Sequence, residues 1–184
     1  KFHFYGKASH AANAPENGRS ALDAVELTDI GANYLREHVP SDVRIHYTIV
    51  DGGVAPNIVP DKAVVWYYMR AFSREVVENV YERLVKVAKG AAMMTETELE
   101  IEFLGGCYNT QNNQVLAGVV AEAMNEIPQE PWTQEELDFA AALDEQTADA
   151  ARATTKKYGL PADTHLYTGP GQVTCFNSYG STDV

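Results

Sequence analysis

Four short stretches within the first 108 residues have the apolar alternation, or the β-branched and aromatic composition, of β-strands. These stretches are residues 1–7, 43–50, 62–72 and 98–103. The last is the most regular, because Leu99, Ile101 and Phe103 alternate with glutamates, as in a strand with one buried face. A loop rich in Gly and Pro joins the second stretch to the third, which predicts an antiparallel pair.

Helical patterns lie between these strands. Ser20 and Asp23 resemble a capping box and predict a helix that runs to about Val39, where a proline stops it. Ser73 is expected to cap a second helix. The apolar stripe of that helix consists of Val77, Val80, Leu84, Val87 and Ala91. The order strand, helix, strand, strand, helix, strand predicts an α+β fold of the ferredoxin-like β-α-β-β-α-β type, which ends near residue 108.

The first predicted helix has two apolar faces. One comprises Ala21, Val25, Thr28, Ala32, Leu35 and Val39, and the other comprises Ala24, Leu27, Gly31, Tyr34 and His38. The two sets lie about 100° apart around the helix. One apolar face is enough to cover a sheet. The second face packs either on another part of the same chain or on a partner subunit, where the small residues Ala24 and Gly31 allow a close approach.

The rest of the chain has a different pattern. Residues 112–127 have helical spacing, two prolines follow, and Thr133 with Glu136 predicts a further helix to about Tyr158. Residues 159–184 are rich in Gly and Pro and predict a loop that belongs to a larger body. We therefore expect a domain at residues 1–108 and a partial, mainly helical segment at 109–184, in a chain cut from a longer protein.

Composition and charge exclude several classes of function. The 184 residues contain 45% hydrophobic side chains and have a formal net charge of −12, with 14 basic against 26 acidic residues. An acidic balance of this size disfavours nucleic acid. No stretch approaches the ~20 apolar residues of a membrane span. Cys107 and Cys175 match neither a disulfide framework nor a zinc ribbon, so we expect half-buried thiols in a cytoplasmic protein.

Three side chains are candidates for binding or catalysis. His10 follows a glycine in a loop, where it is either a solvated or capping residue or a donor to a polarised carbonyl. Asn57 lies between two prolines and bonds either its own backbone or a ligand. Arg70 ends a strand and pairs either with a surface acid or with a substrate carboxylate. The other histidines, His3, His38, His46 and His165, lack metal-ligand spacing and are interpreted as structural or surface residues.

Motifs around these three residues resemble a known family. They are Gly6-Lys-Ala-Ser-His-Ala11, Ser20-Ala-Leu-Asp-Ala24, Pro56-Asn-Ile-Val-Pro-Asp61 and Met69-Arg-Ala-Phe72. In this order they resemble the lid, or dimerisation, domain of the aminoacylase and glutamate carboxypeptidase family of metal-dependent amidohydrolases. The resemblance covers residues 1 to about 108. It implies hydrolysis of an N-acyl or N-aroyl amino acid, assisted by zinc or manganese whose ligands are not in this sequence.

The resemblance also implies a role for each candidate residue. His10 would reach the metal site of a partner subunit and help to bind the scissile carbonyl, while Asn57 and Arg70 would contact the carboxylate end of the substrate. The partner would be a second copy, in a homodimer through the lid, or a paralogous A subunit. The chain alone is expected to be inactive, because the catalytic glutamate and the metal ligands are missing from it.

Two other classes of function remain open at this stage. A purely structural dimerisation module would use His10, Asn57 and Arg70 only for folding. A ferredoxin-like ligand- or RNA-binding module would use aromatic residues on its sheet as stacking platforms, although the acidic balance and the missing basic pattern disfavour it.

Overall fold

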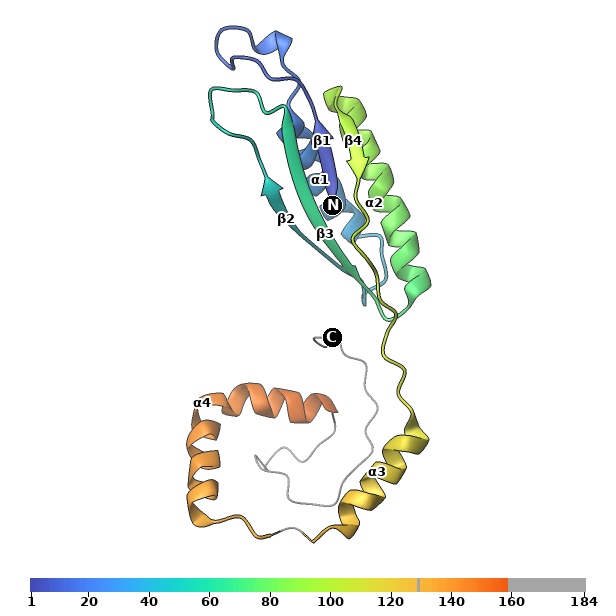
Figure 1. Cartoon of the computed structure of the whole chain (residues 1–184), viewed down its shortest axis with the longest axis vertical. Helices are drawn as coiled ribbons and strands as arrows, with labels where there is room; N and C mark the ends of the chain where they lie inside the picture. Colours follow the sequence, from blue (N-terminus) through green and yellow to red (C-terminus); the bar gives the residue numbers. More distant parts are fainter. Residues whose placement is uncertain (129, 159–184) are drawn as a thin grey trace. The chain divides into compact units, whose positions relative to one another are not determined.

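The computed structural model describes residues 1–128 and 130–158 (Figure 1). The chain forms two compact units with a boundary between Asn109 and Thr110. The first unit carries the sheet and all three candidate residues.

The first unit is a four-stranded sheet with two helices. Its elements are β1 (Phe2–Tyr5), α1 (Ala21–Arg36), β2 (Arg44–Asp51), β3 (Lys62–Arg70), α2 (Arg74–Thr95) and β4 (Glu98–Ile101), with a short 3-10 turn at Pro15–Asn17. The strand order is β2-β3-β1-β4, and every neighbouring pair is antiparallel. This arrangement confirms the α+β expectation of a sheet with two helices, followed by further helices.

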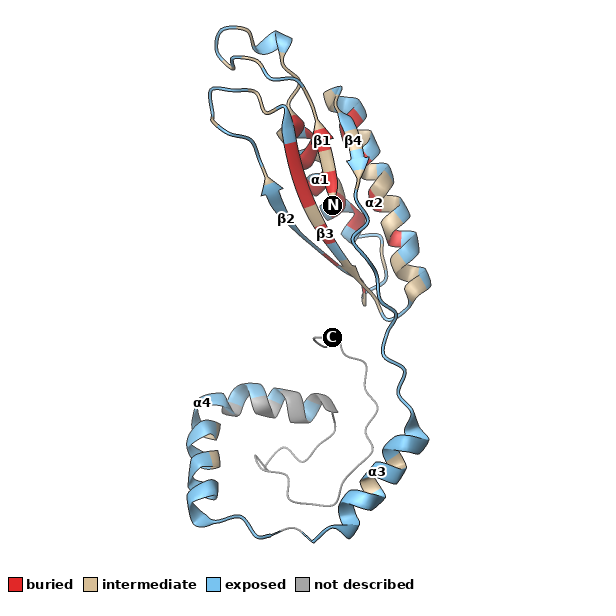
Figure 2. Ribbon diagram, in the orientation of Figure 1, coloured by how far each residue is buried: buried red, intermediate tan, exposed pale blue. Residues whose placement is uncertain are grey.

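The two helices cover one face of the sheet and leave the other face open (Figures 1 and 2). On β1, Phe2 and Phe4 are buried against the helices, while the alternate residues are only half-buried. Val65 and Tyr67 of β3 continue this buried side. Because side chains alternate along a strand, the even-numbered β3 residues that end at Arg70 lie on the open face.

The second apolar face of α1 packs mainly on α2. A Cβ atom at Gly31 would lie 2.4 Å from Cγ1 of Val87, so only glycine allows this approach. Ala24, from the same face, is fully buried. Ala24 and Gly31 therefore pack within the chain, so no partner subunit is needed to explain the small residues on this face. Tyr34, at the outer side of this face, is 67% exposed.

The ends of the helices differ slightly from the expectation. Ser20 caps α1 as predicted, because its Oγ accepts the N–H of Asp23 at 3.1 Å. The helix ends at Arg36 rather than near Val39, because the last turn tightens through bonds to carbonyls three residues back, such as Glu37 N–H to Tyr34 O at 3.2 Å. Ser73 precedes α2 but makes no side-chain cap bond.

One buried acid was not anticipated. Asp29 of α1 is 5% exposed and accepts a hydrogen bond from the hydroxyl of Tyr67 on β3. Burial raises the pKa of the Asp29 carboxyl, although the Tyr67 hydrogen bond opposes that shift. Burial likewise raises the pKa of Tyr67. The pair links the first helix to the centre of the sheet.

The second unit contains helices α3 (Gln114–Glu126) and α4 (Gln134–Tyr158). Asn113 caps α3, and Thr133 with Glu136 forms the predicted capping box, in which the Thr133 N–H donates to Glu136 Oε2 at 2.8 Å. The hydrogen bonds from Thr133 lower the pKa of the Glu136 carboxyl. The predicted loop at 159–184, with His165 and Cys175, lies outside the described residues. No helix in the described part combines the length and apolarity that crossing a membrane requires.

Candidate functional site

The loops that carry His10 and Asn57 lie side by side, beyond the end of the sheet where Tyr5 pairs with Lys62. His10 and Ile58 form an isolated β-bridge. The N–H of Ala11 donates to the carbonyl of Asn57 at 2.9 Å. The antiparallel pairing of β1 with β3 explains this arrangement, because the chain leaving β1 meets the chain entering β3 at the same end of the sheet.

The backbone around His10 selects one tautomer of its ring. The N–H groups of Ala12 and Asn13 both donate to Nδ1 of His10, each at 3.2 Å. A nitrogen that accepts hydrogen bonds carries no proton, so the neutral ring must carry its proton on Nε2. The His10 side chain is exposed. The loop therefore presents a fixed N–H donor to a ligand rather than a base.

Glycine and short backbone bonds hold this loop in place. A Cβ atom at Gly6 would lie 2.0 Å from the carbonyl oxygen of Arg19, so the close pairing of Lys7 with Arg19 requires glycine. The Ser9 carbonyl accepts the N–H of Val59 at 2.9 Å. The conformation of the His10 loop is thus set by bonds to the neighbouring connections before any ligand arrives.

Asn57 is fixed by its backbone, and its side chain is exposed. Within residues 1–128 and 130–158 its side-chain amide makes no hydrogen bond, so the alternative of an amide that bonds its own backbone finds no support there. The amide lies on the loop next to His10.

Arg70 lies at the other end of β3. It lies eight positions after Lys62 along the strand, which corresponds to about 26 Å at the usual rise of a strand. The Arg70 guanidinium carbon lies 5.9 Å from the centre of the Tyr68 ring. His10 and Asn57 therefore share one end of the first unit, and Arg70 occupies the opposite end.

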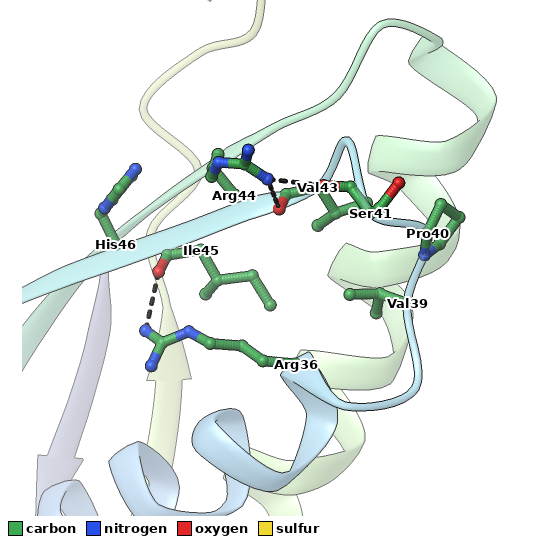
Figure 3. A pocket seen from close by; sticks show the side chains of 8 residues that line it. All are labelled: Arg36, Val39, Pro40, Ser41, Val43, Arg44, Ile45 and His46. Carbon is green, nitrogen blue, oxygen red and sulfur yellow. Dashed lines mark hydrogen bonds between the residues drawn. The ribbon is translucent and has the colours of Figure 1, made fainter.

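Arg70 is paired with a second arginine, which the sequence interpretation missed. Arg44 of β2 lies directly opposite it in the ladder. Arg44, but not Arg70, lines a cavity of about 530 Å³ at the connection from α1 to β2 (Figure 3). Its lining includes Arg36, Arg44 and His46. Figure 3 shows Arg44 and His46 on one side of β2 and Ile45 on the other, toward Arg36.

The described residues do not form a metal site. No group of three or more His, Cys, Asp or Glu side chains suited to a metal ion occurs among them. His3 instead binds Oε2 of Glu102 at 3.0 Å through Nε2, and Lys1 binds the same carboxylate. These two contacts lower the pKa of Glu102. Cys107 is exposed, so the expectation that it is half-buried is wrong, because the segment after β4 packs little of its length against the sheet.

Comparison with known proteins identifies the family to which the first unit belongs. The family model of the peptidase dimerisation domain matches residues 1–94. The B subunit of p-aminobenzoyl-glutamate hydrolase from Escherichia coli is 43% identical over 141 residues, which are 76% of this chain and 29% of that protein. The Xaa-Arg dipeptidase of Mus musculus is 35% identical over 65% of this chain and 28% of that protein.

A solved structure is similar as well. The aminobenzoyl-glutamate utilization protein of Klebsiella pneumoniae superposes with a TM-score of 0.57 at 26% identity, over 69% of this chain and 32% of that one. The chain spans about a third or less of the length of these relatives. The match of the family model to half of the chain, together with the four-stranded sheet and its two helices, shows that the chain belongs to the M20 peptidase dimerisation domain family.

Proposed function

We propose that this chain is the dimerising and substrate-binding lid of a metal-dependent amidohydrolase, active on an N-acyl or N-aroyl amino acid. The family match and the similarity to the B subunit of p-aminobenzoyl-glutamate hydrolase support this assignment. They make p-aminobenzoyl-glutamate the substrate to test first. The observation that carries the proposal is the exposed His10 ring, whose Nδ1 is occupied by two backbone donors.

In this proposal, His10 donates its Nε2 hydrogen to the oxygen of the scissile carbonyl. When the carbonyl carbon becomes tetrahedral, negative charge grows on that oxygen and the hydrogen bond strengthens, which stabilises the transition state more than the ground state. Asn57, on the adjacent loop, would contact the carboxylate end of the same substrate as His10, in a different site from the Arg70 of its own chain. Zinc or manganese would supply the activated hydroxide. Residues elsewhere in the protein would hold the metal, because the described residues provide no ligand set.

The positions of the three residues favour an arrangement in which they serve two different active sites. A dipeptide-sized substrate spans about 7 Å, which is far less than the ~26 Å between the ends of β3. One substrate therefore cannot contact both His10 and Arg70 of the same chain. In a two-fold dimer, His10 and Asn57 would serve the partner's site, and Arg70 would bind the substrate carboxylate in the site of its own protomer.

The surface we propose for dimerisation runs along β2 and the adjoining flank of α1. β2 is an edge strand of eight residues without lysine or proline, the residues that usually prevent pairing. It exposes Ile49 at 42% and Val50 at 55%, and α1 exposes Ile30 at 50%. Pairing of β2 with a second β2 would extend the sheet and cover these side chains. The partner is a second copy of this chain or, as the name of the bacterial relative suggests, a paralogous A subunit.

Replacement of His10 by Ala in the full-length protein tests the proposal. We expect kcat to fall by about 100- to 1,000-fold, the usual effect of removing one oxyanion donor, while the dimer and the bound metal are retained. His38→Ala is the matched control, because this exposed histidine follows the end of α1 and faces no candidate residue. Unchanged turnover in His10→Ala would favour the purely structural dimerisation module.

A further inference from the structure

We infer that Ser9 is a positioning residue for His10, because its hydroxyl closes the turn whose backbone N–H groups hold the His10 ring in one tautomer. The inference rests on the proposed function, in which the hydrogen on Nε2 of His10 binds the scissile carbonyl. It assigns Ser9 a part in the reaction that is exerted through His10 and needs no contact with the substrate.

The chain after His10 forms a turn that two hydrogen bonds close. The N–H of Ala14 donates to the carbonyl of His10 at 3.1 Å, which is the bond of a single helical turn. The hydroxyl of Ser9 donates to the carbonyl of Ala14. Residues 11–13 are therefore held between one backbone bond and one side-chain bond.

The carbonyl of Ala14 is a well-placed acceptor for the Ser9 hydroxyl. It also accepts the N–H of Asn17 at 3.2 Å, in the short 3-10 turn Pro15–Asn17. A carbonyl oxygen has two lone pairs, so both bonds can form at once. The Ser9 hydroxyl thus ties the turn after His10 to the 3-10 turn that follows it.

The two donors to the His10 ring lie inside this turn. The N–H groups of Ala12 and Asn13 each reach Nδ1 at 3.2 Å, which requires the turn to bring both groups to the same ring nitrogen. These distances are at the long end of the normal range, so a small opening of the turn would break the bonds. A neutral imidazole without such donors can carry its proton on either nitrogen. Loss of the Ser9 bond would therefore lower the fraction of rings that offer a hydrogen at Nε2.

The backbone of Ser9 is anchored independently of its hydroxyl. Its carbonyl accepts the N–H of Val59 at 2.9 Å, and the residue is half-buried. Removal of the hydroxyl alone leaves this bond and the bridge between His10 and Ile58 in place. Ser9→Ala should therefore loosen the turn without displacing the loop, which distinguishes positioning of the ring from folding.

The test reads the tautomer of His10 from the NMR resonances of its ring nitrogens in the full-length protein loaded with zinc. The signal that is missing from His10→Ala identifies the residue. We expect wild-type His10 to carry its proton on Nε2 when the ring is neutral, and the resonances of Ser9→Ala to move toward the form protonated on Nδ1. The kcat for p-aminobenzoyl-glutamate should fall by about 2- to 12-fold, the usual effect of losing one hydrogen bond. KM should stay nearly unchanged, because the donor acts mainly in the transition state.

Two variants are matched controls. Ser20→Ala removes another serine hydroxyl from the same unit, but that hydroxyl caps α1 through the N–H of Asp23. We expect it to lower the thermal midpoint and to leave the His10 resonances and kcat as in the wild type. Ser9→Thr keeps a hydroxyl on Cβ, so its resonances and kcat should be closer to the wild type than those of Ser9→Ala.

The outcomes separate the inference from the proposed function. Unchanged resonances in Ser9→Ala, changed resonances with an unchanged kcat, or the same changes in Ser20→Ala would overturn the role of Ser9. Full turnover in His10→Ala would instead overturn the proposed function, and the inference would fall with it. The two failures are distinguishable because the resonances of Ser9→Ala are measured without substrate.

Discussion

Replacement of Ile49 by Lys should dissociate the dimer that we propose. Ile49 lies on the edge strand β2, on the helix-covered side of the sheet, opposite the buried Val65. Its side chain is 42% exposed, so a partner strand would cover the remaining surface. The lysine would place an ammonium group in that apolar contact, at the cost of removing the charge from water.

The expected increase in the dissociation constant follows from the exposed fraction of the Ile49 side chain. Complete burial of an isoleucine side chain contributes about 1.5–3 kcal/mol. The 42% that is still exposed accounts for about 0.6–1.3 kcal/mol in each copy, and for about 1.3–2.5 kcal/mol in a two-fold dimer. The loss of this term alone raises the dissociation constant by about 10- to 70-fold. The desolvation of two ammonium groups would raise it further.

Sedimentation equilibrium of the full-length protein over a range of concentrations measures this constant. Thr48→Lys is the matched control, because Thr48 is the neighbouring edge position on the open face, where a lysine stays in water. Circular dichroism should show that both variants fold. An unchanged constant for Ile49→Lys, or an equal effect of Thr48→Lys, would refute the assignment of β2 to the interface.

Two further predictions concern the core of the first unit. Because burial raises the pKa of Asp29 above its ordinary value of 3.8, its contribution to stability is complete below that value and is lost as pH rises through the raised pKa. Asp29→Asn should abolish this pH-dependent loss of stability. Urea denaturation of the wild type and of Asp29→Asn between pH 3.8 and neutral pH measures the difference. If the free energy of unfolding changes with pH in the same way in both proteins, the prediction is contradicted. Gly31→Ala places a Cβ 2.4 Å from Cγ1 of Val87, so we expect a loss of about 1–3 kcal/mol that Val87→Ala partly restores. Gly31→Ala with unchanged stability would show that α1 and α2 are less tightly packed than the structure indicates.

Much of the fold could be predicted from the sequence, because each element has a local signal. The Ser20 cap, the alternation of Leu99 and Ile101 with glutamates, and the order of helices and strands depend on neighbouring residues and were confirmed. The expectation that Phe103 continues the buried side of that strand is wrong, because β4 ends at Ile101 and Phe103 is 66% exposed. The ends of elements were less accurate, as with α1, which stops at Arg36. There the final turn depends on the geometry of the connection to β2, which the residue pattern does not contain.

The candidate site was predictable only in part. The family motifs make His10, Asn57 and Arg70 candidates, and the antiparallel pairing of β1 with β3 then separates Arg70 from the other two. The tautomer of His10 depends on two backbone N–H groups, which no side-chain pattern reveals. The partner of Arg70 was hidden because a long loop joins β2 to β3, and an irregularity between Ile49 and Asp51 shifts their register.

Mixed dimers test the central claim most directly. We expect homodimers of full-length His10→Ala and homodimers of Arg70→Ala each to be nearly inactive. In a mixed dimer, the His10→Ala protomer keeps its own Arg70 and receives an intact His10 from its partner. One of the two active sites of the mixed dimer is therefore complete. An equimolar mixture, exchanged and reassembled, should recover about a quarter of wild-type activity, because random pairing makes half of the dimers mixed. A mixture no more active than its parents would contradict the claim that each lid serves two active sites.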